Sequence, residues 1–209
     1  MRVDLSKHPV VELKKEDGTA ISRLFIGINW NQNTYAGEAD FDLDLGAFVS
    51  GFDKQITDVA DIINYAFGKQ HRSGVVEYTG DNRNGNDNDG VSYLGHHYDE
   101  AMYVDTSKFP ADKDMISLYA TIYLAHKRNQ NFGLVSNASV EVIDMDDPGN
   151  SFHFDLSNDP KYTALTALVL LEIKKVGSGF TLQKVARGFA GGTKELYANF
   201  GLEIKGDDY

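Results

Sequence analysis

Hydrophobic and polar residues alternate along much of this 209-residue chain, which is the pattern of β-strands that bury one face. Between residues 22 and 30, for example, Leu24, Ile26 and Ile28 fall on one face of an extended chain. Glycine, asparagine and aspartate separate the alternating segments and supply turns. The pattern predicts strands at residues 10–14, 22–30, 39–45, 61–67, 74–78, 101–105, 116–123, 138–144, 151–156, 164–176 and 179–187.

The last third of the chain combines a predicted hairpin with a predicted helix. Residues 164–176 and 179–187 flank a glycine-rich turn, although the first of the two segments fits a helix equally well. Residues 193–200 are predicted to be helical, with Thr193 as the N-cap and Glu195 in the first turn. Short, closely spaced strands are typical of a two-sheet β-sandwich. We therefore predict an all-β fold with a few short helices, forming one domain over residues 1–209.

Composition supports a folded protein and argues against a nucleic-acid partner. Hydrophobic residues make up 42% of the chain, enough for a sizeable core. The net charge is −11, from 31 acidic and 20 basic residues, whereas nucleic-acid binders concentrate Lys and Arg on one face. Cysteine is absent, which excludes disulfides and thiolate metal sites. No apolar signal region opens the chain, and residues 164–173 are too short to span a bilayer, so we expect a cytoplasmic protein without a transmembrane segment.

The most unusual segment is residues 80–100, GDNRNGNDNDGVSYLGHHYDE. Seven short Asp and Asn side chains lie between its glycines, and such a polar run cannot form part of a hydrophobic core. Calcium takes about six to eight oxygen ligands from carboxylates, amides and carbonyls, so the loop could hold this ion. An ordinary solvated turn explains the same composition. The EF-hand spacing is not met, because Gly85 stands where the first Asp belongs and His96 where the closing Glu belongs.

A second acidic segment precedes this loop. In an extended chain Asp40, Asp42 and Asp44 point to one side, while Phe41 and its apolar neighbours point to the other. Three carboxylates on one face repel one another unless water or a cation screens them. A solvated outer face and a metal site are both compatible with this strand. We expect it to supply the ligands that the loop lacks.

Several segments, taken in order, resemble the tellurium-resistance (TerD-like) calcium-binding proteins over nearly the full length. The resemblance implies a β-sandwich that binds calcium through its acidic strand and acidic loop, with a stress-resistance role that is not enzymatic. One departure is that residues 91–98 intervene before the closing Asp-Glu of the loop. The segments that carry the resemblance are residues 40–44, 78–82, 99–100, 105–110, 128–133, 136–138 and 188–192.

The same resemblance implies the ligands and the partners. Calcium is the expected cofactor, and no catalytic residue is implied. The expected partners besides calcium are other tellurium-resistance proteins at the inner membrane surface, which would make the protein peripheral to the membrane. The implied ligands are Asp40, Asp42, Asp44, Asp81, Asn82, Asp87, Asp89, Asp99 and Glu100.

Three functions remain compatible with these residues. The first is a calcium-binding scaffold or sensor. The second is a hydrolase that uses the carboxylates to hold a catalytic metal, which would need a general base or nucleophile at the same site. The third is a module that attaches to anionic membrane when calcium is bound. None of the six histidines lies in a known catalytic motif, which favours the first function.

Overall fold

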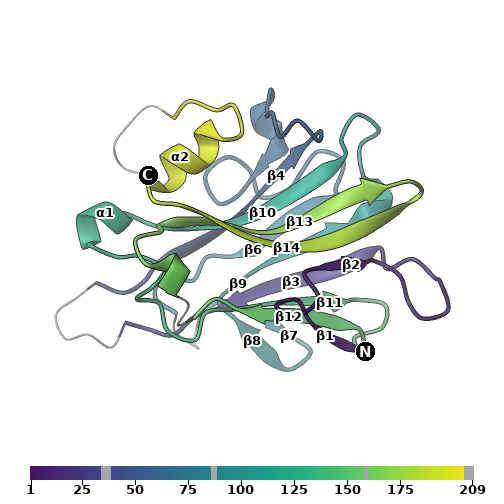
Figure 1. Cartoon of the computed structure of the whole chain (residues 1–209), viewed down its shortest axis with the longest axis horizontal. Helices are drawn as coiled ribbons and strands as arrows, with labels where there is room; N and C mark the ends of the chain where they lie inside the picture. Colours follow the sequence, from purple (N-terminus) through teal and green to yellow (C-terminus); the bar gives the residue numbers. More distant parts are fainter. Residues whose placement is uncertain (34–38, 86–88, 158–159, 205–209) are drawn as a thin grey trace.

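A computed structural model describes residues 1–33, 39–85, 89–157 and 160–204. Two six-stranded sheets lie face to face, and a separate two-stranded hairpin covers part of one of them (Figure 1). The predicted all-β fold with two large sheets and a few short helices is confirmed. Within the described ranges, no helix is long and apolar enough to cross a membrane.

The first sheet has the strand order β1-β12-β11-β3-β9-β6. Its edge strand β1 pairs with β12 in parallel, and its other pairs are antiparallel. These strands comprise β1 (Arg2–Asp4), β3 (Arg23–Asn29), β6 (Val76–Gly80), β9 (Glu100–Asp105), β11 (Ser139–Asp144) and β12 (Ser151–Asp155).

The second sheet has the order β2-β14-β13-β10-β4-β5 and is antiparallel throughout. The segment that fitted either a strand or a helix is strand β13. These strands comprise β2 (Val10–Glu12), β4 (Leu43–Ser50), β5 (Ile62–Ile63), β10 (Met115–Ile122), β13 (Ala167–Val176) and β14 (Gly179–Phe189).

The main core fills the space between the sheets, as the alternation predicts. Leu24, Ile26 and Ile28 of β3 lie in it, and the apolar side of the acidic segment, including Phe41 and Leu43, is also buried there. The acidic strand itself is displaced from its predicted position: β4 begins at Leu43, because its pairing with β10 begins there. The predicted strand at residues 39–45 is therefore correct only for its last three residues.

A turn replaces most of the strand predicted at residues 61–67. Only Ile62–Ile63 pair with β4. The side-chain oxygen of Asn64 then accepts hydrogen bonds from the backbone N–H groups of Ala66 and Phe67, both at 2.9 Å. An asparagine that satisfies backbone donors two and three residues ahead forms a local turn and ends the strand.

The C-terminal helix α2 (Gly192–Ala198) packs against the second sheet through Leu196 and Tyr197. The predicted helix is confirmed, but the predicted N-cap at Thr193 is wrong. Gly191 is the N-cap, and its N–H donates to the carboxylate of Glu195 at 2.8 Å. Gly192, the first residue of the helix, has a φ of 65°, a left-handed conformation that glycine adopts without steric cost.

The residues between the acidic loop and β9 form a hairpin, β7 (Val91–Tyr93) and β8 (His96–Tyr98), which the alternation did not predict. It packs on the outer face of the first sheet, where the rings of Tyr93 and Phe25 stack with centroids 4.1 Å apart. Tyr98 lies over Gly27, where a Cβ atom would come within 2.2 Å of its ring. The remaining short helices are η1 (Val59–Asp61), η2 (Thr106–Lys108), α1 (Ala125–Arg128) and η3 (Pro160–Tyr162).

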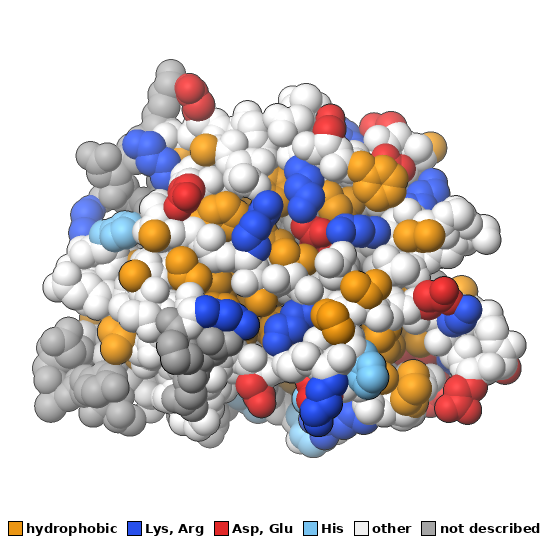
Figure 2. All heavy atoms as spheres, viewed as in Figure 1, with side chains coloured by type: hydrophobic (Ala, Val, Ile, Leu, Met, Phe, Trp, Pro, Cys, Tyr) orange, Lys and Arg blue, Asp and Glu red, His pale blue; other side chains and the backbone are white. Residues whose placement is uncertain are grey.

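Charge is unevenly distributed over the surface of this acidic protein. Figure 2 shows Lys and Arg side chains gathered over the middle of the face formed by β13 and β14. Buried Glu172 of β13 forms ion pairs there with Lys54 and with Lys174, the second at 2.7 Å. Asp42 and Asp44, which form no such ion pair among the described residues, lie elsewhere, at the start of β4.

Candidate functional site

Three of the predicted ligands meet at one cavity. Asp42, Asp44 and Asp81 line a space of about 200 Å³, together with Tyr65, Tyr123 and Arg83. We call this space the acidic cavity. Its lining joins the start of β4, the first residues of the acidic loop and the end of β10, which are distant in sequence.

The sheet and its core fix the carboxylates that belong to β4. Phe41, Leu43 and Leu45 are buried in the main core, so the alternating carboxylates point away from it. The backbone N–H of Tyr123 donates to the carbonyl of Asp42 at 2.8 Å, which continues the pairing between the two strands. This contact brings the Tyr123 side chain to the same cavity as the acidic strand.

A buried polar pair, Asn82 with Asp99, holds the start of the acidic loop. The amide nitrogen of Asn82 donates to one Asp99 oxygen at 2.6 Å, and the other Asp99 oxygen accepts from the N–H of Trp30 at 2.8 Å. The amide oxygen of Asn82 accepts from the N–H groups of Asn84 and Gly85 at 3.1 and 3.0 Å. These two predicted ligands therefore shape the loop and do not line the cavity.

Glu100, another predicted ligand, is completely buried behind the cavity. Its carboxylate accepts a hydrogen bond from the backbone N–H of Leu45 at 2.5 Å and another from the Tyr78 hydroxyl at 2.7 Å. Burial holds the pKa of this carboxyl well above its usual range, and the nearby Asp44 raises it further. Glu100 thereby connects β9 of one sheet to β4 of the other.

The remaining predicted ligands lie outside this arrangement. Asp40 and Asp89 are exposed and are not part of the cavity lining. Their backbone carbonyls accept hydrogen bonds from Gln130 and from Asn82, respectively. Asp87 falls outside the described residues.

Asp44 is the chemically distinctive group of the acidic cavity. Its side chain is only 9% exposed, and among the described residues it has neither a hydrogen-bond donor nor an ion-pair partner. Burial, reinforced by the charges of Asp42 and Asp81, raises the pKa of Asp44 to about 8. Burial also raises the pKa of Asp42 to about 6. A buried carboxylate without a partner favours either a proton or an external cation.

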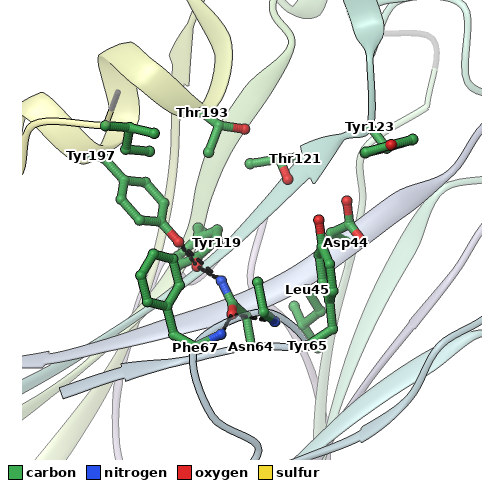
Figure 3. Close-up of a pocket in the computed structure, with 12 residues that line it drawn as sticks. Asp44, Leu45, Asn64, Tyr65, Phe67, Tyr119, Thr121, Tyr123, Thr193 and Tyr197 are labelled. Carbon is green, nitrogen blue, oxygen red and sulfur yellow. Dashed lines mark hydrogen bonds between the residues drawn. The ribbon is translucent and has the colours of Figure 1, made fainter. Parts of the chain in front are cut away.

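A narrower pocket of about 20 Å³ adjoins the cavity and shares Asp44, Tyr65 and Tyr123 with it. Figure 3 shows these three side chains on one side and a set of hydrogen bonds on the other. There the amide nitrogen of Asn64 donates to the hydroxyl groups of Tyr119 and Tyr197 at 3.0 and 2.9 Å. A volume of this size holds about one water molecule, so the larger cavity is the place for a ligand.

The donor set of the acidic cavity fits a hard cation. Carboxylate and phenol oxygens line it, and oxygen is the ligand atom that calcium prefers. Within the described ranges, however, no three Asp, Glu or His side chains stand close enough together to make a ready metal centre. The carboxylates surround a space instead of meeting at a point. A cation would draw them inward and recruit further oxygen ligands.

Sequence patterns missed the other residues of the cavity. Tyr65 lies in the turn made by Asn64, and Tyr123 follows the last residue of β10. Arg83 is the one Lys or Arg in the acidic loop, a signal that was present in the sequence. Its guanidinium donates to the carboxylate of Asp81 at 3.0 Å.

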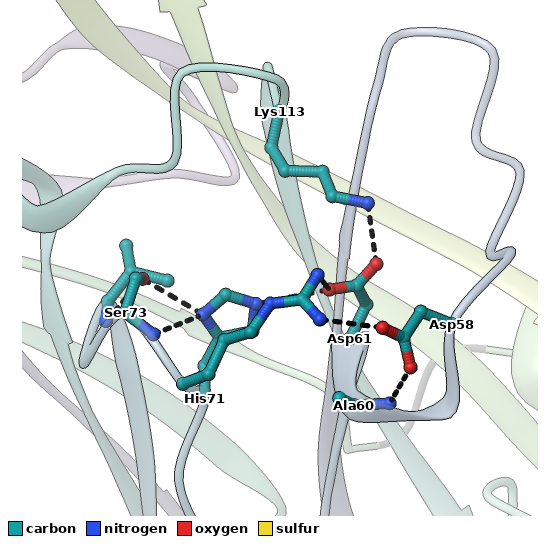
Figure 4. A network of polar contacts seen from close by, with 8 residues as sticks. Asp58, Ala60, Asp61, His71, Ser73 and Lys113 are labelled. Carbon is teal, nitrogen blue, oxygen red and sulfur yellow. Dashed lines mark hydrogen bonds and ion pairs between the residues drawn. The ribbon is translucent and has the colours of Figure 1, made fainter.

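A second buried carboxylate, Asp61, contrasts with Asp44. Its oxygens accept from Lys113 at 2.5 Å and from Arg72 at 3.2 Å, and they lie 3.2 Å from the Nε2 atom of His71 (Figure 4). The N–H of Ser73 donates to Nδ1 of the same imidazole at 3.1 Å, which leaves Nε2 to carry the proton toward Asp61. We call these four charged or titratable residues the Asp61 cluster. All of its groups have partners, so it offers no open position to a ligand.

Comparison with known proteins adds a family to this geometry. The TerD domain model matches residues 1–200. An uncharacterized Bacillus subtilis protein, YceE, is 38% identical and covers 98% of this chain and 100% of its own length. General stress protein 16U of the same organism is 30% identical, with 98% and 100% covered. Tellurium resistance protein TerD of Alcaligenes is 31% identical, with 97% and 98% covered.

A solved structure has the same fold. It is that of a homologue of telluride resistance protein (TerD) from Streptomyces coelicolor, with a TM-score of 0.61 and 17% identity. The match covers 85% of this chain and 95% of the Streptomyces chain. The two chains therefore share their overall architecture despite a low sequence identity.

Proposed function

The chain belongs to the TerD domain family of tellurium-resistance and general stress proteins, and from that premise we propose that it is a calcium-binding protein without catalytic activity. In this proposal the acidic cavity receives the ion. Asp42 and Asp44 from the start of β4 and Asp81 from the loop supply the charged ligands. The protein would then act as a sensor or scaffold whose loop responds to calcium.

The unpartnered Asp44 carboxylate carries this proposal. Buried charges in proteins are commonly paired, because an isolated charge is costly to remove from water. Glu172 and Asp61 follow this rule inside the same protein, since lysine ammonium groups reach both of them. Asp44 has no such partner among the described residues, and it lines a cavity large enough for a cation and several waters. A divalent cation would satisfy Asp44, Asp42 and Asp81 together.

Calcium fits this cavity better than magnesium. Calcium accepts a variable shell of about six to eight oxygens, whereas magnesium demands a tighter octahedron and gives up its water reluctantly. The loosely arranged carboxylates favour the ion that tolerates longer and less regular contacts. When bound, calcium would supply positive charge that holds the start of the acidic loop against β4.

The lining of the acidic cavity also supports a role without catalysis. Its described residues are three aspartates, two tyrosines and one arginine, with no histidine, serine or lysine among them. A metal-dependent hydrolase would need a base or nucleophile close to its metal. The His71 imidazole is buried in the Asp61 cluster, where it is already hydrogen-bonded.

Calcium titration of the metal-stripped protein tests the proposal. Isothermal titration should detect binding to the parent, and Asp44→Asn should weaken that binding at least tenfold while preserving the shape of the side chain. Asp112→Asn is the matched control, because Asp112 is an exposed aspartate that does not line the cavity. Equal affinity in the parent and Asp44→Asn would place the ion elsewhere. No binding in any variant would refute the calcium function.

A further inference from the structure

The acidic cavity already contains one positive charge that belongs to the protein. Arg83 lines it beside the three carboxylates and forms an ion pair with Asp81 at 3.0 Å. Arginine is an unusual neighbour for a cation site, because its fixed charge repels the ion that the carboxylates attract. Its presence therefore affects how strongly any cation binds.

The backbone of Arg83 is held in place, whereas its side chain is largely exposed to solvent. The buried amide of Asn82 accepts hydrogen bonds from Asn84 and Gly85 and so fixes the turn around Arg83. The Arg83 side chain, in contrast, is 74% exposed and has a carboxylate partner that is itself 40% exposed. Exposed ion pairs of this kind contribute at most about 1 kcal/mol, so the guanidinium can be displaced at low cost.

We propose that Arg83 is the residue that sets the affinity and the charge selectivity of the acidic cavity, by acting as an internal counter-ion that an incoming cation must displace from Asp81. This inference rests on the calcium function proposed above and goes further by naming what limits binding. In the absence of a ligand, Arg83 neutralises Asp81 at the mouth of the cavity. Asp44 is left without a partner deeper inside, where the arginine does not form an ion pair.

The charge balance of the cavity explains the selectivity. Three carboxylates and one guanidinium leave a net charge of minus two when all four groups are ionised, which matches a divalent ion. Without the arginine the net charge would be minus three, which favours a trivalent ion. Arg128, a second cation near these carboxylates, lies over the Tyr123 ring and donates to the Asp40 carbonyl, and it does not line the cavity.

Four proteins test this role: the parent, Arg83→Gln, Arg83→Lys and the control Arg23→Gln. Arg23 also forms an ion pair with an exposed aspartate, Asp146, but at a distant site on the first sheet. Each metal-stripped protein is titrated calorimetrically with Ca²⁺ and with the trivalent ion La³⁺. We expect Arg83→Gln to bind Ca²⁺ about fivefold more tightly, or about 1 kcal/mol, and La³⁺ about tenfold more tightly. Arg83→Lys, which keeps the charge, and Arg23→Gln should stay within about threefold of the parent.

The outcomes separate this inference from the calcium function. Calcium binding by the parent with unchanged or weaker binding by Arg83→Gln would overturn the role of Arg83 and leave the calcium site intact. Binding by Arg83→Gln alone would support the role of Arg83 and show that the parent cavity is blocked. An equal gain for both ions would refute the charge selectivity. Absence of binding in all four proteins would overturn both proposals.

Discussion

Two aspartates of this protein are buried to a similar degree but have opposite electrostatic surroundings. Asp61 is fully buried, and Lys113, His71 and Arg72 surround its carboxylate. Asp44 is 9% exposed, has no such partner, and lies beside two further aspartates. The charge of Asp61 is therefore balanced by residues of the protein itself, whereas the charge of Asp44 is open to pairing with an ion from solution.

This difference shows how burial alone fails to distinguish structural from functional carboxylates. In the Asp61 cluster, the carboxylate joins η1 to the segment before β6 and to the loop before β10, so its charge serves the fold. In the acidic cavity, burial and the charges of Asp42 and Asp81 raise the pKa of Asp44 to about 8, and the more distant charges of Arg83 and Arg128 offset only part of this rise. A buried carboxylate that has no cationic partner and lines a cavity is the feature that indicates a ligand site.

The largest expected change in the free energy of unfolding is that of a substitution at Asp61. Asp61→Asn should lower the free energy of unfolding by about 3–5 kcal/mol, because Lys113 would remain buried without a counter-charge. Urea denaturation followed by circular dichroism measures this loss. If the variant does not fold, Lys113→Gln tests the same pair from the other side. A loss below about 1 kcal/mol in both variants would mean that the cluster does not stabilise the fold.

Asp44→Asn should act in the opposite direction. In the metal-free protein at pH 8, this change should raise the free energy of unfolding by on the order of 2 kcal/mol, since it removes a buried charge that has no partner. The same urea experiment, performed with a chelator present, measures the gain. A loss of stability instead would show that the Asp44 carboxylate has a stabilising partner.

The stability of the parent and of Asp44→Asn should also depend differently on pH. Because the pKa of Asp44 is raised to about 8 from an ordinary value of 3.8, the folded state holds its proton more tightly than the unfolded state. The metal-free parent should therefore lose stability as pH rises from about 4 to about 8, and Asp44→Asn should lose less. Saturating calcium should reduce this loss by pairing with the ionised carboxylate. Identical pH profiles for the parent and Asp44→Asn would contradict the raised pKa.

Calcium binding should release protons near neutral pH. At pH 7 a carboxyl with a pKa of about 8 is mostly protonated, so the ion must displace a proton from Asp44. As the pH increases toward 8, calcium affinity should accordingly rise about tenfold per pH unit, and above pH 8 it should level off. Titrations in buffers with different ionisation enthalpies count the released protons. If calcium binding releases no protons at pH 7, Asp44 is already ionised in the metal-free protein.

The smallest effect is expected at Arg72, the exposed member of the Asp61 cluster. Its side chain is 55% exposed, so Arg72→Gln should cost less than about 1 kcal/mol of unfolding free energy. Comparison with Asp61→Asn in the same urea series shows whether the buried donors stabilise Asp61. A loss similar to that of Asp61→Asn would assign the main role to the exposed arginine.

The sequence alone predicted the architecture and singled out three of the residues that line the acidic cavity. Alternation identified the apolar face of β3 and the buried side of the acidic strand, because side-chain direction in a strand is a local property. It failed at residues 64–67, where the Asn64 side chain satisfies backbone donors and turns the chain. It also missed the hairpin β7–β8, whose aromatic residues pack on the outer face of the first sheet.

Only the tertiary structure separated the predicted ligands by role. Their short oxygen-bearing side chains are alike in sequence, but Asn82 and Asp99 bond to each other while Asp42, Asp44 and Asp81 face a common cavity. Sheet packing also brought Tyr65, Tyr123 and Arg83 to that cavity, and joined Asp61 to Lys113 across 52 residues of chain. Strand patterns arise from neighbouring residues, whereas the partners of a buried charge depend on which distant segments meet, and that is decided by the pairing and packing of the sheets.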